Sequence, residues 1–137
     1  MRYVAVALVV GLALIVASLA QRRRPAAPVR TGRNLPEQLD RADFARPEAP
    51  FLIAVFTSAT CATCAEIMRK VEVLAGDAVA VHEAEFGRDR RLHVRYGIAA
   101  VPAVLIADAA GVVRTSFLGP TTASDLWAAM AELRETG

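Results

Sequence analysis

The stretch FLIAVFTSATCATCAEIMRKVEVLA, residues 51–75, decides the fold of this 137-residue chain. Its first part, Phe51–Thr57, is a continuous apolar run, which is the pattern of a strand buried on both faces. From Cys61 to Ala75 apolar residues recur at helical spacing, and Gly76 is a natural end for that helix. A buried strand that passes directly into a helix predicts a parallel strand–helix–strand unit in an α/β domain.

The two cysteines of the chain, Cys61 and Cys64, stand where this strand gives way to the helix. A disulfide between residues so close in sequence closes almost no loop, so it adds little as a structural crosslink. Thiol–disulfide exchange, by contrast, needs one exposed sulfur that ionises easily and a second within bonding reach. Cys61, at the helix N-terminus where negative charge is stabilised, is the predicted nucleophile. Cys64, one turn further in, is the predicted resolving thiol.

A metal site is the competing interpretation of two closely spaced cysteines. One such pair supplies two ligands, whereas a closed zinc site needs four. The only histidines, His82 and His93, fall in a predicted strand and a predicted charged helix, and we interpret both as structural residues. The sequence therefore predicts no metal at Cys61 and Cys64.

The chain from Leu35 onward alternates predicted strands and helices, so the expected fold class is α/β, with a central mixed β-sheet flanked by helices. The further predicted strands are 79–84, 103–107 and 112–118, the last two joined by a turn at 108–111. The further predicted helices are a short amphipathic one at 35–44, a charged one at 88–96, and a last one that Thr122 or Ser124 caps and that reaches about Glu135. Trp127 falls in this last helix, where we expect it to pack rather than to act at a site.

A second segment, Tyr96–Pro102 (YGIAAVP), leads into the third predicted strand. A Cys-x-x-Cys motif between a strand and a helix, followed at this distance by Val-Pro, resembles the thioredoxin family over residues 51–135. The resemblance implies a thioredoxin-like fold in which the bond before Pro102 is cis and Pro102 lies against the active-site disulfide. It also implies that the backbone of Val101 pairs with an extended substrate, so that Thr60, Val101 and Pro102 are the expected substrate-binding residues.

The sequence departs from the family's pattern at the site itself. Thr60 replaces the tryptophan that usually precedes the first cysteine, and Ala62-Thr63 replaces Gly-Pro. Val55 stands where the family has a buried aspartate that serves proton transfer, and Glu83 or Glu85 is a candidate substitute. These differences bear on the redox potential and on the direction of the reaction, and they leave the dithiol chemistry intact.

The motif and the resemblance together predict a thiol–disulfide oxidoreductase that exchanges disulfides with protein substrates through Cys61 and Cys64. Its expected partners are proteins that carry disulfides or dithiols, and an electron donor or acceptor protein. No cofactor is expected beyond the Cys61–Cys64 disulfide itself. Two other functions stay open. One is a tethered binding module that holds a partner between the cysteine loop and Pro102 with little turnover, and the other is a Cys-x-x-Cys carrier of copper or zinc.

The N-terminal segment differs from the rest of the chain in hydropathy. Residues 3–20 are uncharged and largely apolar, and as a helix they span about 27 Å, near the short limit for crossing a membrane. The sequence therefore predicts a transmembrane anchor (or signal peptide) at 1–21, a basic, proline-containing linker at 22–34 and the thioredoxin-like domain at 35–137. A single-pass membrane protein is therefore expected, and the arginines at 22–24 favour a cytoplasmic domain, with an extracytoplasmic one as the alternative.

The charge distribution excludes nucleic acid as a predicted partner. The net charge of +2 combines six arginines before Asn34 with 14 acidic and 10 basic residues after it, so the domain carries four net negative charges. A nucleic-acid-binding domain concentrates basic charge on the domain itself. Here the basic residues cluster beside the apolar segment, where they suit the anionic headgroups of membrane lipid.

Overall fold

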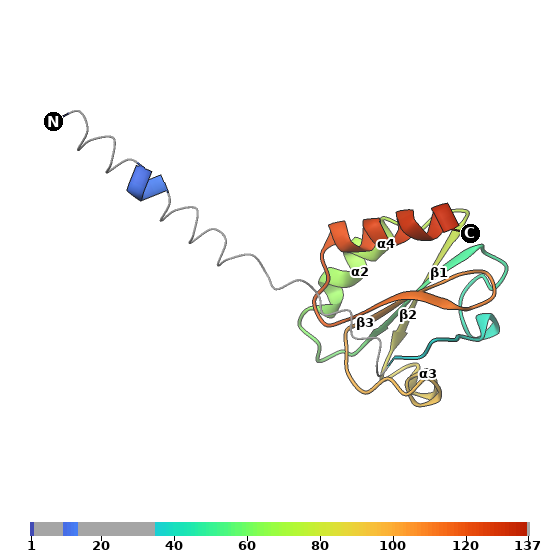
Figure 1. Cartoon of the computed structure of the whole chain (residues 1–137). Coiled ribbons are helices and arrows are strands. Elements are labelled where there is room, and N and C mark those ends of the chain that lie inside the picture. Colours follow the sequence, from blue (N-terminus) through green and yellow to red (C-terminus); the bar gives the residue numbers. More distant parts are fainter. Residues whose placement is uncertain (2–9, 14–34, 137) are drawn as a thin grey trace.

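A four-stranded sheet organises the computed structural model, which describes Met1, residues 10–13 and residues 35–136 (Figure 1). The strands are β1 (Phe51–Thr57), β2 (Val79–Glu85), β3 (Ala103–Ala107) and β4 (Val113–Leu118). Their order across the sheet is β2-β1-β3-β4. β1 is parallel to β2 and antiparallel to β3, which is antiparallel to β4. The predicted mixed sheet, a parallel unit followed by a hairpin, is confirmed.

Helical segments cover both faces of this sheet (Figure 1). On one face lie α2 (Cys64–Glu72) and α4 (Ala123–Thr136), and on the other lie α3 (Arg90–Arg95) and the short 3-10 turn η1 (Arg41–Asp43). The three helices predicted after the first strand are confirmed, although α2 and α3 are shorter than predicted. Of the two predicted caps for α4, Thr122 is used, because its hydroxyl accepts a hydrogen bond from the Asp125 N–H (3.1 Å).

The central strand β1 divides the core into two layers. Ile53 and Val55 pack with residues of α2 and α4, whereas Leu52 and Phe56 pack against the N-terminal part of the domain and the segment around α3. Successive side chains of a strand point to opposite faces, so an unbroken apolar sequence supplies both layers at once. Residues 51–57 are therefore apolar almost without interruption.

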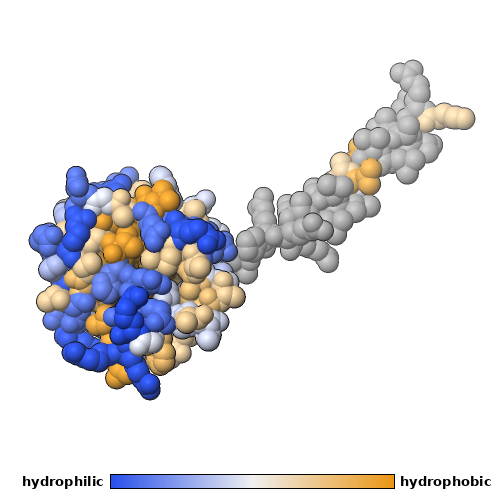
Figure 2. All heavy atoms as spheres, turned by 180° about the vertical axis from the view of Figure 1, so that it is seen from behind, coloured by the Kyte–Doolittle hydropathy of each residue, from blue (hydrophilic) through white to orange (hydrophobic). Residues whose placement is uncertain are grey.

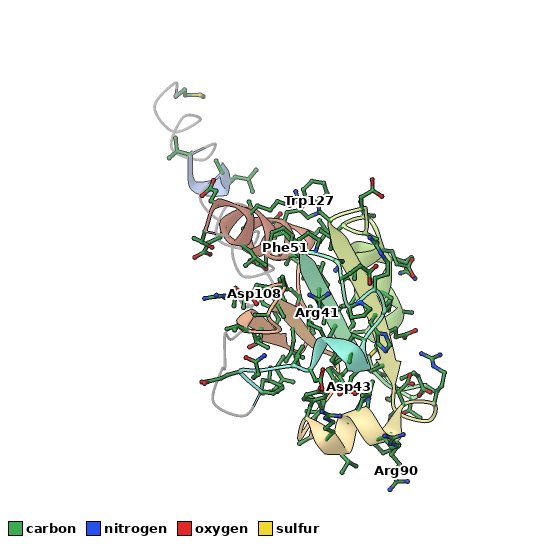
Figure 3. The ribbon with its side chains drawn as sticks, turned by 90° about the vertical axis from the view of Figure 1, so that its right-hand side faces the viewer. Arg41, Asp43, Phe51, Arg90, Asp108 and Trp127 are labelled. Carbon is green, nitrogen blue, oxygen red and sulfur yellow. A yellow bond between two sulfur atoms is a disulfide. The ribbon has the colours of Figure 1, made fainter. Side chains whose placement is uncertain are left out.

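The expectation that Trp127 packs in the last helix is wrong, because the residue is 55% exposed. α4 buries Leu126, Met130 and Leu133, which are three or four positions apart and so share one face of the helix. Trp127 follows Leu126 directly and therefore lies off that face. Figure 3 shows Trp127 at the opposite end of the domain from α3.

The predicted helix at 35–44 is not formed. Instead the chain runs past the β3–β4 turn, where the N–H of Leu39 donates to the carbonyl oxygen of Gly111 (2.8 Å), and only the three residues of η1 are helical. The spacing of Leu35 and Leu39 fits a helix and also an extended chain, because a step of four returns to the same face in both. Leu39 and Phe44 are buried all the same, and they belong to the second core layer.

The predicted transmembrane anchor is not supported. None of the helices among the described residues is long and apolar enough to cross a membrane, which contradicts the predicted single-pass membrane localisation on either side. Most of the predicted anchor, 2–9 and 14–21, and the whole predicted linker at 22–34 lie outside the described residues.

We expect Gly111→Ala to lower the free energy of unfolding by more than about 1 kcal/mol. Gly111 has a φ of +79°, and a Cβ atom there would collide with the Leu39 carbonyl oxygen, so the contact that holds the N-terminal part of the domain must shift. Gly76→Ala is the matched control, because its Cβ would meet nothing within 4 Å. Urea unfolding of the full chain measures both variants. Equal stability of the two would contradict this account of Gly111.

Candidate active site

The two cysteines lie in the loop that joins β1 to α2. The predicted helix is shorter at this end, because α2 begins at Cys64 and leaves Cys61 three residues ahead of it. The loop is nevertheless held by its backbone. The N–H of Cys61 donates to the Ser58 carbonyl oxygen (3.1 Å), and the N–H of Cys64 donates to the Cys61 carbonyl oxygen (3.4 Å). The chain therefore turns tightly from the strand end into the first residue of the helix.

Cys61 and Cys64 form a disulfide, with their Cα atoms 5.5 Å apart. The two sulfur-bearing residues differ in accessibility, since Cys61 is half-buried and Cys64 is only 3% exposed. An external thiolate that attacks this disulfide therefore reaches the Cys61 sulfur first. The hydroxyl oxygen of Thr63, in the same loop, lies 3.8 Å from the Cys61 sulfur.

The segment before β3 reaches the same end of the sheet. The bond between Val101 and Pro102 is cis, as the resemblance implied, and Pro102 is buried while Val101 is half-buried. Pro102 precedes Ala103, which pairs with Phe56 near the end of β1, so the proline lies at the edge from which the cysteine loop departs. Its carbonyl oxygen accepts a hydrogen bond from the Gly119 N–H (2.8 Å).

Thr60, the third predicted substrate-binding residue, is exposed on the cysteine loop. Its hydroxyl lies 3.3 Å from that of Ser58, within the same loop. The side chain is therefore available at the surface one residue before Cys61. It does not provide the large apolar area that a tryptophan would place there.

Glu85, at the end of β2, fastens the cysteine loop to the neighbouring turn. Its carboxylate accepts hydrogen bonds from the N–H groups of Ala59 (3.1 Å), Gly87 (3.0 Å) and Arg88 (3.1 Å). The N–H of Gly87, followed by those of Arg88 and Ala59, lowers the pKa of the Glu85 carboxyl, outweighing the effect of burial. One carboxylate thus ties the start of the loop to the β2–α3 turn.

Glu83 lies elsewhere, on the face of the sheet that α2 covers. It pairs in register with Val55, and in a parallel pair such residues point to the same face. The buried hydroxyl of Thr57 donates to the Glu83 carboxylate (2.8 Å). A carboxylate is therefore held in the α2 layer, at the strand ends next to the cysteine loop, one strand away from the position that Val55 fills with an apolar side chain.

Both histidines have the structural roles that we expected. His93 is 3% exposed, its Nε2 lies 2.8 Å from the Ala84 carbonyl oxygen, and its ring packs edge-on against those of Phe56 and Phe86. His82 accepts a hydrogen bond at Nδ1 from the Ala45 N–H (3.0 Å), and burial lowers the pKa of its ring. In these contacts the two imidazole rings bind backbone atoms and other rings, and neither contact involves Cys61 or Cys64.

Sequence reasoning missed Thr57 as the partner of Glu83. The residue reads as the last position of an apolar strand, and only the register between β1 and β2 places its hydroxyl beside a carboxylate. The role of Phe86 was also missed. Its N–H donates to the Thr57 carbonyl oxygen (2.9 Å), and its ring is 42% exposed beside the loop. An exposed aromatic residue directly after a strand is the signal that could have revealed it.

No family model matches the chain, but a relative does. A protein from Methanothermobacter thermautotrophicus described as a "Probable Thioredoxin" is 35% identical over 86 residues, which are 61% of this chain and 95% of the relative. The chain belongs to the thioredoxin family. Its Cys61–Cys64 pair, at disulfide distance at the end of the first strand, is the dithiol motif of a thiol–disulfide oxidoreductase of this family.

Solved structures support the thioredoxin-like fold. A mutant thioredoxin from Halobacterium salinarum superposes with a TM-score of 0.52 at 22% identity, covering 58% of this chain and 71% of that one. A malarial protein superposes with a TM-score of 0.56 at 12% identity, covering 61% of this chain and 96% of that one. At these identities the likeness concerns the fold, and it agrees with the mixed sheet flanked by helices.

Acidification should loosen the thioredoxin loop ahead of Cys61. The pKa of Glu85 is lower in the folded chain than in the unfolded one, so its contribution to stability is full above the unfolded value, about 4.3. That contribution is lost as the pH falls from there through the folded-state pKa. Glu85→Gln should therefore lose less unfolding free energy on acidification than the wild type does.

Amide hydrogen exchange provides the local readout for the same variant. At neutral pH, the Ala59 and Gly87 amides of Glu85→Gln should exchange faster than in the wild type, because a neutral amide oxygen is a weaker acceptor than a carboxylate. An identical pH slope of stability together with unchanged exchange at these amides would contradict the role given to Glu85.

Proposed function

We propose that this thioredoxin-family protein exchanges disulfides with protein substrates, with Cys61 as the nucleophile and Cys64 as the resolving thiol. The observation that carries the proposal is the unequal accessibility of the two bonded cysteines, Cys61 half-buried and Cys64 3% exposed. Exchange proceeds by attack of a thiolate on a disulfide sulfur, so the accessible sulfur is the one that meets a substrate. The free N–H groups at the start of α2 favour negative charge on the adjoining loop.

The two steps balance without any bound cofactor. In the reduced protein the Cys61 thiolate attacks one sulfur of a substrate disulfide, forms a mixed disulfide and releases the other substrate sulfur as a thiolate. Cys64 then loses its proton and attacks the Cys61 sulfur, which restores the Cys61–Cys64 bond and releases the second substrate thiol. The same steps run in reverse when a substrate dithiol attacks the disulfide. A second protein with a dithiol or a disulfide returns Cys61 and Cys64 to their starting state.

Substrate binding is assigned to the edge where the loop and the segment before β3 meet. Val101 and Pro102 directly precede β3, at the edge of the sheet from which the cysteine loop departs, and Thr60 is exposed on that loop. The backbone of Val101 is the proposed partner for an extended substrate segment, since a free strand-like edge binds peptides through main-chain hydrogen bonds.

Glu83 is the proposed acceptor of the Cys64 proton. It lies in the layer that α2 covers, as Cys64 does, and the Thr57 hydroxyl holds its carboxylate (2.8 Å). Glu85 is not suited to this role, because its carboxylate is occupied by three backbone N–H groups on the loop side. Of the two candidates that the sequence offered, the structure therefore favours Glu83.

The Cys64→Ser variant should trap its substrates. The first attack by Cys61 survives in this variant and the resolving attack is lost, so mixed disulfides at Cys61 accumulate and insulin reduction falls to background. Mass mapping of the trapped peptide identifies the bonded cysteine. Cys61→Ser is the matched control and should trap nothing, because Cys64 is buried. Mixed disulfides formed through Cys64 in the control would reverse the assignment, and a wild-type protein unable to reduce insulin would refute the function.

The Glu83→Gln variant should slow the resolving step by about 10²-fold, the lower range for loss of a positioned proton acceptor. Attack by Cys61 should be unaffected, so mixed disulfide forms at the wild-type rate and decays slowly. Its decay should recover as the pH rises, because hydroxide then removes the Cys64 proton. Glu72→Gln, an exposed change at the end of α2, is the control. Wild-type decay rates across the pH range in Glu83→Gln would contradict the assignment.

A further inference from the structure

The segment at α3 concentrates the basic charge of an otherwise acidic domain. Residues 35–137 carry 14 acidic and 10 basic side chains, and four of the basic ones are Arg88, Arg90, Arg91 and Arg95, with Asp89 as the one acidic residue among them. An acidic partner is thus repelled by most of the domain and attracted to this segment. Local charge of this kind steers association as well as stabilising a complex.

Two of these arginines are already compensated and two are not. Arg88 pairs with Asp89 (2.9 Å), and Arg95 pairs with both Asp40 (3.2 Å) and Asp43 (3.1 Å). Among residues 35–136, neither Arg90 nor Arg91 is recorded in an ion pair, and both are exposed. Figure 3 shows Arg90 pointing outward from α3, away from Asp43. These two guanidinium groups are therefore free to meet carboxylates of a partner.

Apolar surface lies between the charged groups. A hollow of about 460 Å³ is lined by Arg90, Arg91, Leu92, Val94 and the ion-paired Arg95 and Asp43, and Val94 is 73% exposed. Figure 2 shows apolar atoms flanked by hydrophilic ones at the lower end of the domain, the end at which Figure 1 places α3. The hollow is large enough for a partner's apolar side chain, which the flanking arginines would bracket.

This surface is continuous with the redox site. The guanidinium carbon of Arg90 lies 5.3 Å from the centre of the Phe86 ring, and the ring is 42% exposed. Phe86 in turn follows Glu85, whose carboxylate holds the N–H of Ala59 on the cysteine loop. The hydrogen bond from the Ala59 N–H to the Glu85 carboxylate (3.1 Å) therefore joins the loop that carries Cys61 to the residue next to Phe86, at the edge of the arginine surface.

We propose that Phe86, Arg90, Arg91 and Val94, the α3 basic face, bind an acidic segment next to the disulfide of a protein substrate. Carboxylates of that segment pair with Arg90 and Arg91, and a neighbouring apolar side chain enters the hollow beside Val94. The α3 basic face forms no covalent bond with the substrate and accepts no proton from it. It raises the rate at which acidic substrates reach Cys61. The inference rests on the proposed function, because it gives that exchange reaction its preference among substrates.

Two synthetic peptides of equal length test the proposal on the full chain. Each has one disulfide and one leucine, flanked by glutamates in one peptide and by lysines in the other. At low ionic strength we expect the wild type to reduce the acidic peptide with a kcat/KM about tenfold higher or more, the lower range for electrostatic steering. In R90E/R91E the preference should vanish or reverse. High salt should reduce the wild-type preference, because it screens exposed charges.

The matched control changes the same net charge elsewhere. R69E/R134E alters exposed arginines of α2 and α4 and should keep most of the preference for the acidic peptide. Loss of the preference in both double variants to the same extent would show that net charge alone acts, and it would overturn the assignment to the α3 basic face. Equal reduction of the acidic and the basic peptide by the wild type would also overturn it.

A neutral disulfide separates this proposal from the exchange reaction itself. All variants with both cysteines should reduce bis(2-hydroxyethyl) disulfide at the same rate, since it carries no charge. Failure of every variant on this reagent and on both peptides would refute the exchange reaction. In that case, fluorescence anisotropy of the acidic peptide with Cys61→Ser/Cys64→Ser still decides the binding surface. Affinity that R90E/R91E does not weaken, or that comes only with self-association of the chain, would refute the α3 basic face.

Discussion

Burial of β1 on both of its faces is the constraint on which the rest of the structure depends. A strand with no polar side chain before Thr57 must be covered by two layers, so α2 and α4 occupy one face and the N-terminal part of the domain with α3 occupies the other. The chain leaves the core only where polar contacts become available. At Thr57 the carbonyl oxygen meets the Phe86 N–H and the hydroxyl meets Glu83, so β2 fixes the point at which the cysteine loop begins.

The same strand pairing explains how the site can lack a carboxylate in β1. Val55 keeps the centre of β1 apolar and avoids the cost of desolvating a charge inside the core. Glu83 is its partner in the parallel register, so the carboxylate moves by about one strand spacing, roughly 4.8 Å, and stays on the α2 face. There it is half-buried and accepts a hydrogen bond from the Thr57 hydroxyl.

Much of the fold could be predicted from the sequence, because each layer leaves its own pattern. The apolar run at 51–57, the valine-rich strand at 79–84 and the hairpin around 108–111 specify strands, and the Cys-x-x-Cys and Val-Pro motifs specify where the strands must meet. The helix predicted at 35–44 was wrong since its apolar spacing suits two conformations. What decided between them was the pairing of Leu39 with Gly111, about 70 residues away, which no local pattern contains.

The candidate site was predictable to a smaller extent. Residue types and spacing identify Cys61, Cys64 and Pro102, because a dithiol and an X-Pro bond are local features. The sequence identifies Glu83 and Glu85 as candidate carboxylates, but it does not show where their side chains lie in the fold. Their positions depend on the register between β1 and β2, and a shift by one residue would exchange the faces of Glu83 and Ala84.

The exposure of Trp127 has a similar origin, because the face of α4 that becomes buried is decided by its contact with the sheet.

The last residues of β2 and Phe86, which follows the strand, thus have three separate tasks. Glu83 points into the α2 layer, Glu85 holds the backbone of the cysteine loop, and Phe86 begins the surface that leads to α3. Glu83 and Glu85 are two positions apart and share one face of the strand, so their partners differ because Glu85, the last residue of β2, reaches N–H groups of the loops that follow β1 and β2, whereas Glu83 meets the Thr57 hydroxyl within the sheet. A carboxylate bound by three backbone N–H groups is pinned as an anion and serves geometry, whereas one bound by a single hydroxyl keeps lone pairs free for a proton. The number of hydrogen bonds that each glutamate accepts, rather than its distance along the chain from Cys61, therefore distinguishes the two carboxylates and supports Glu83 as the proposed proton acceptor.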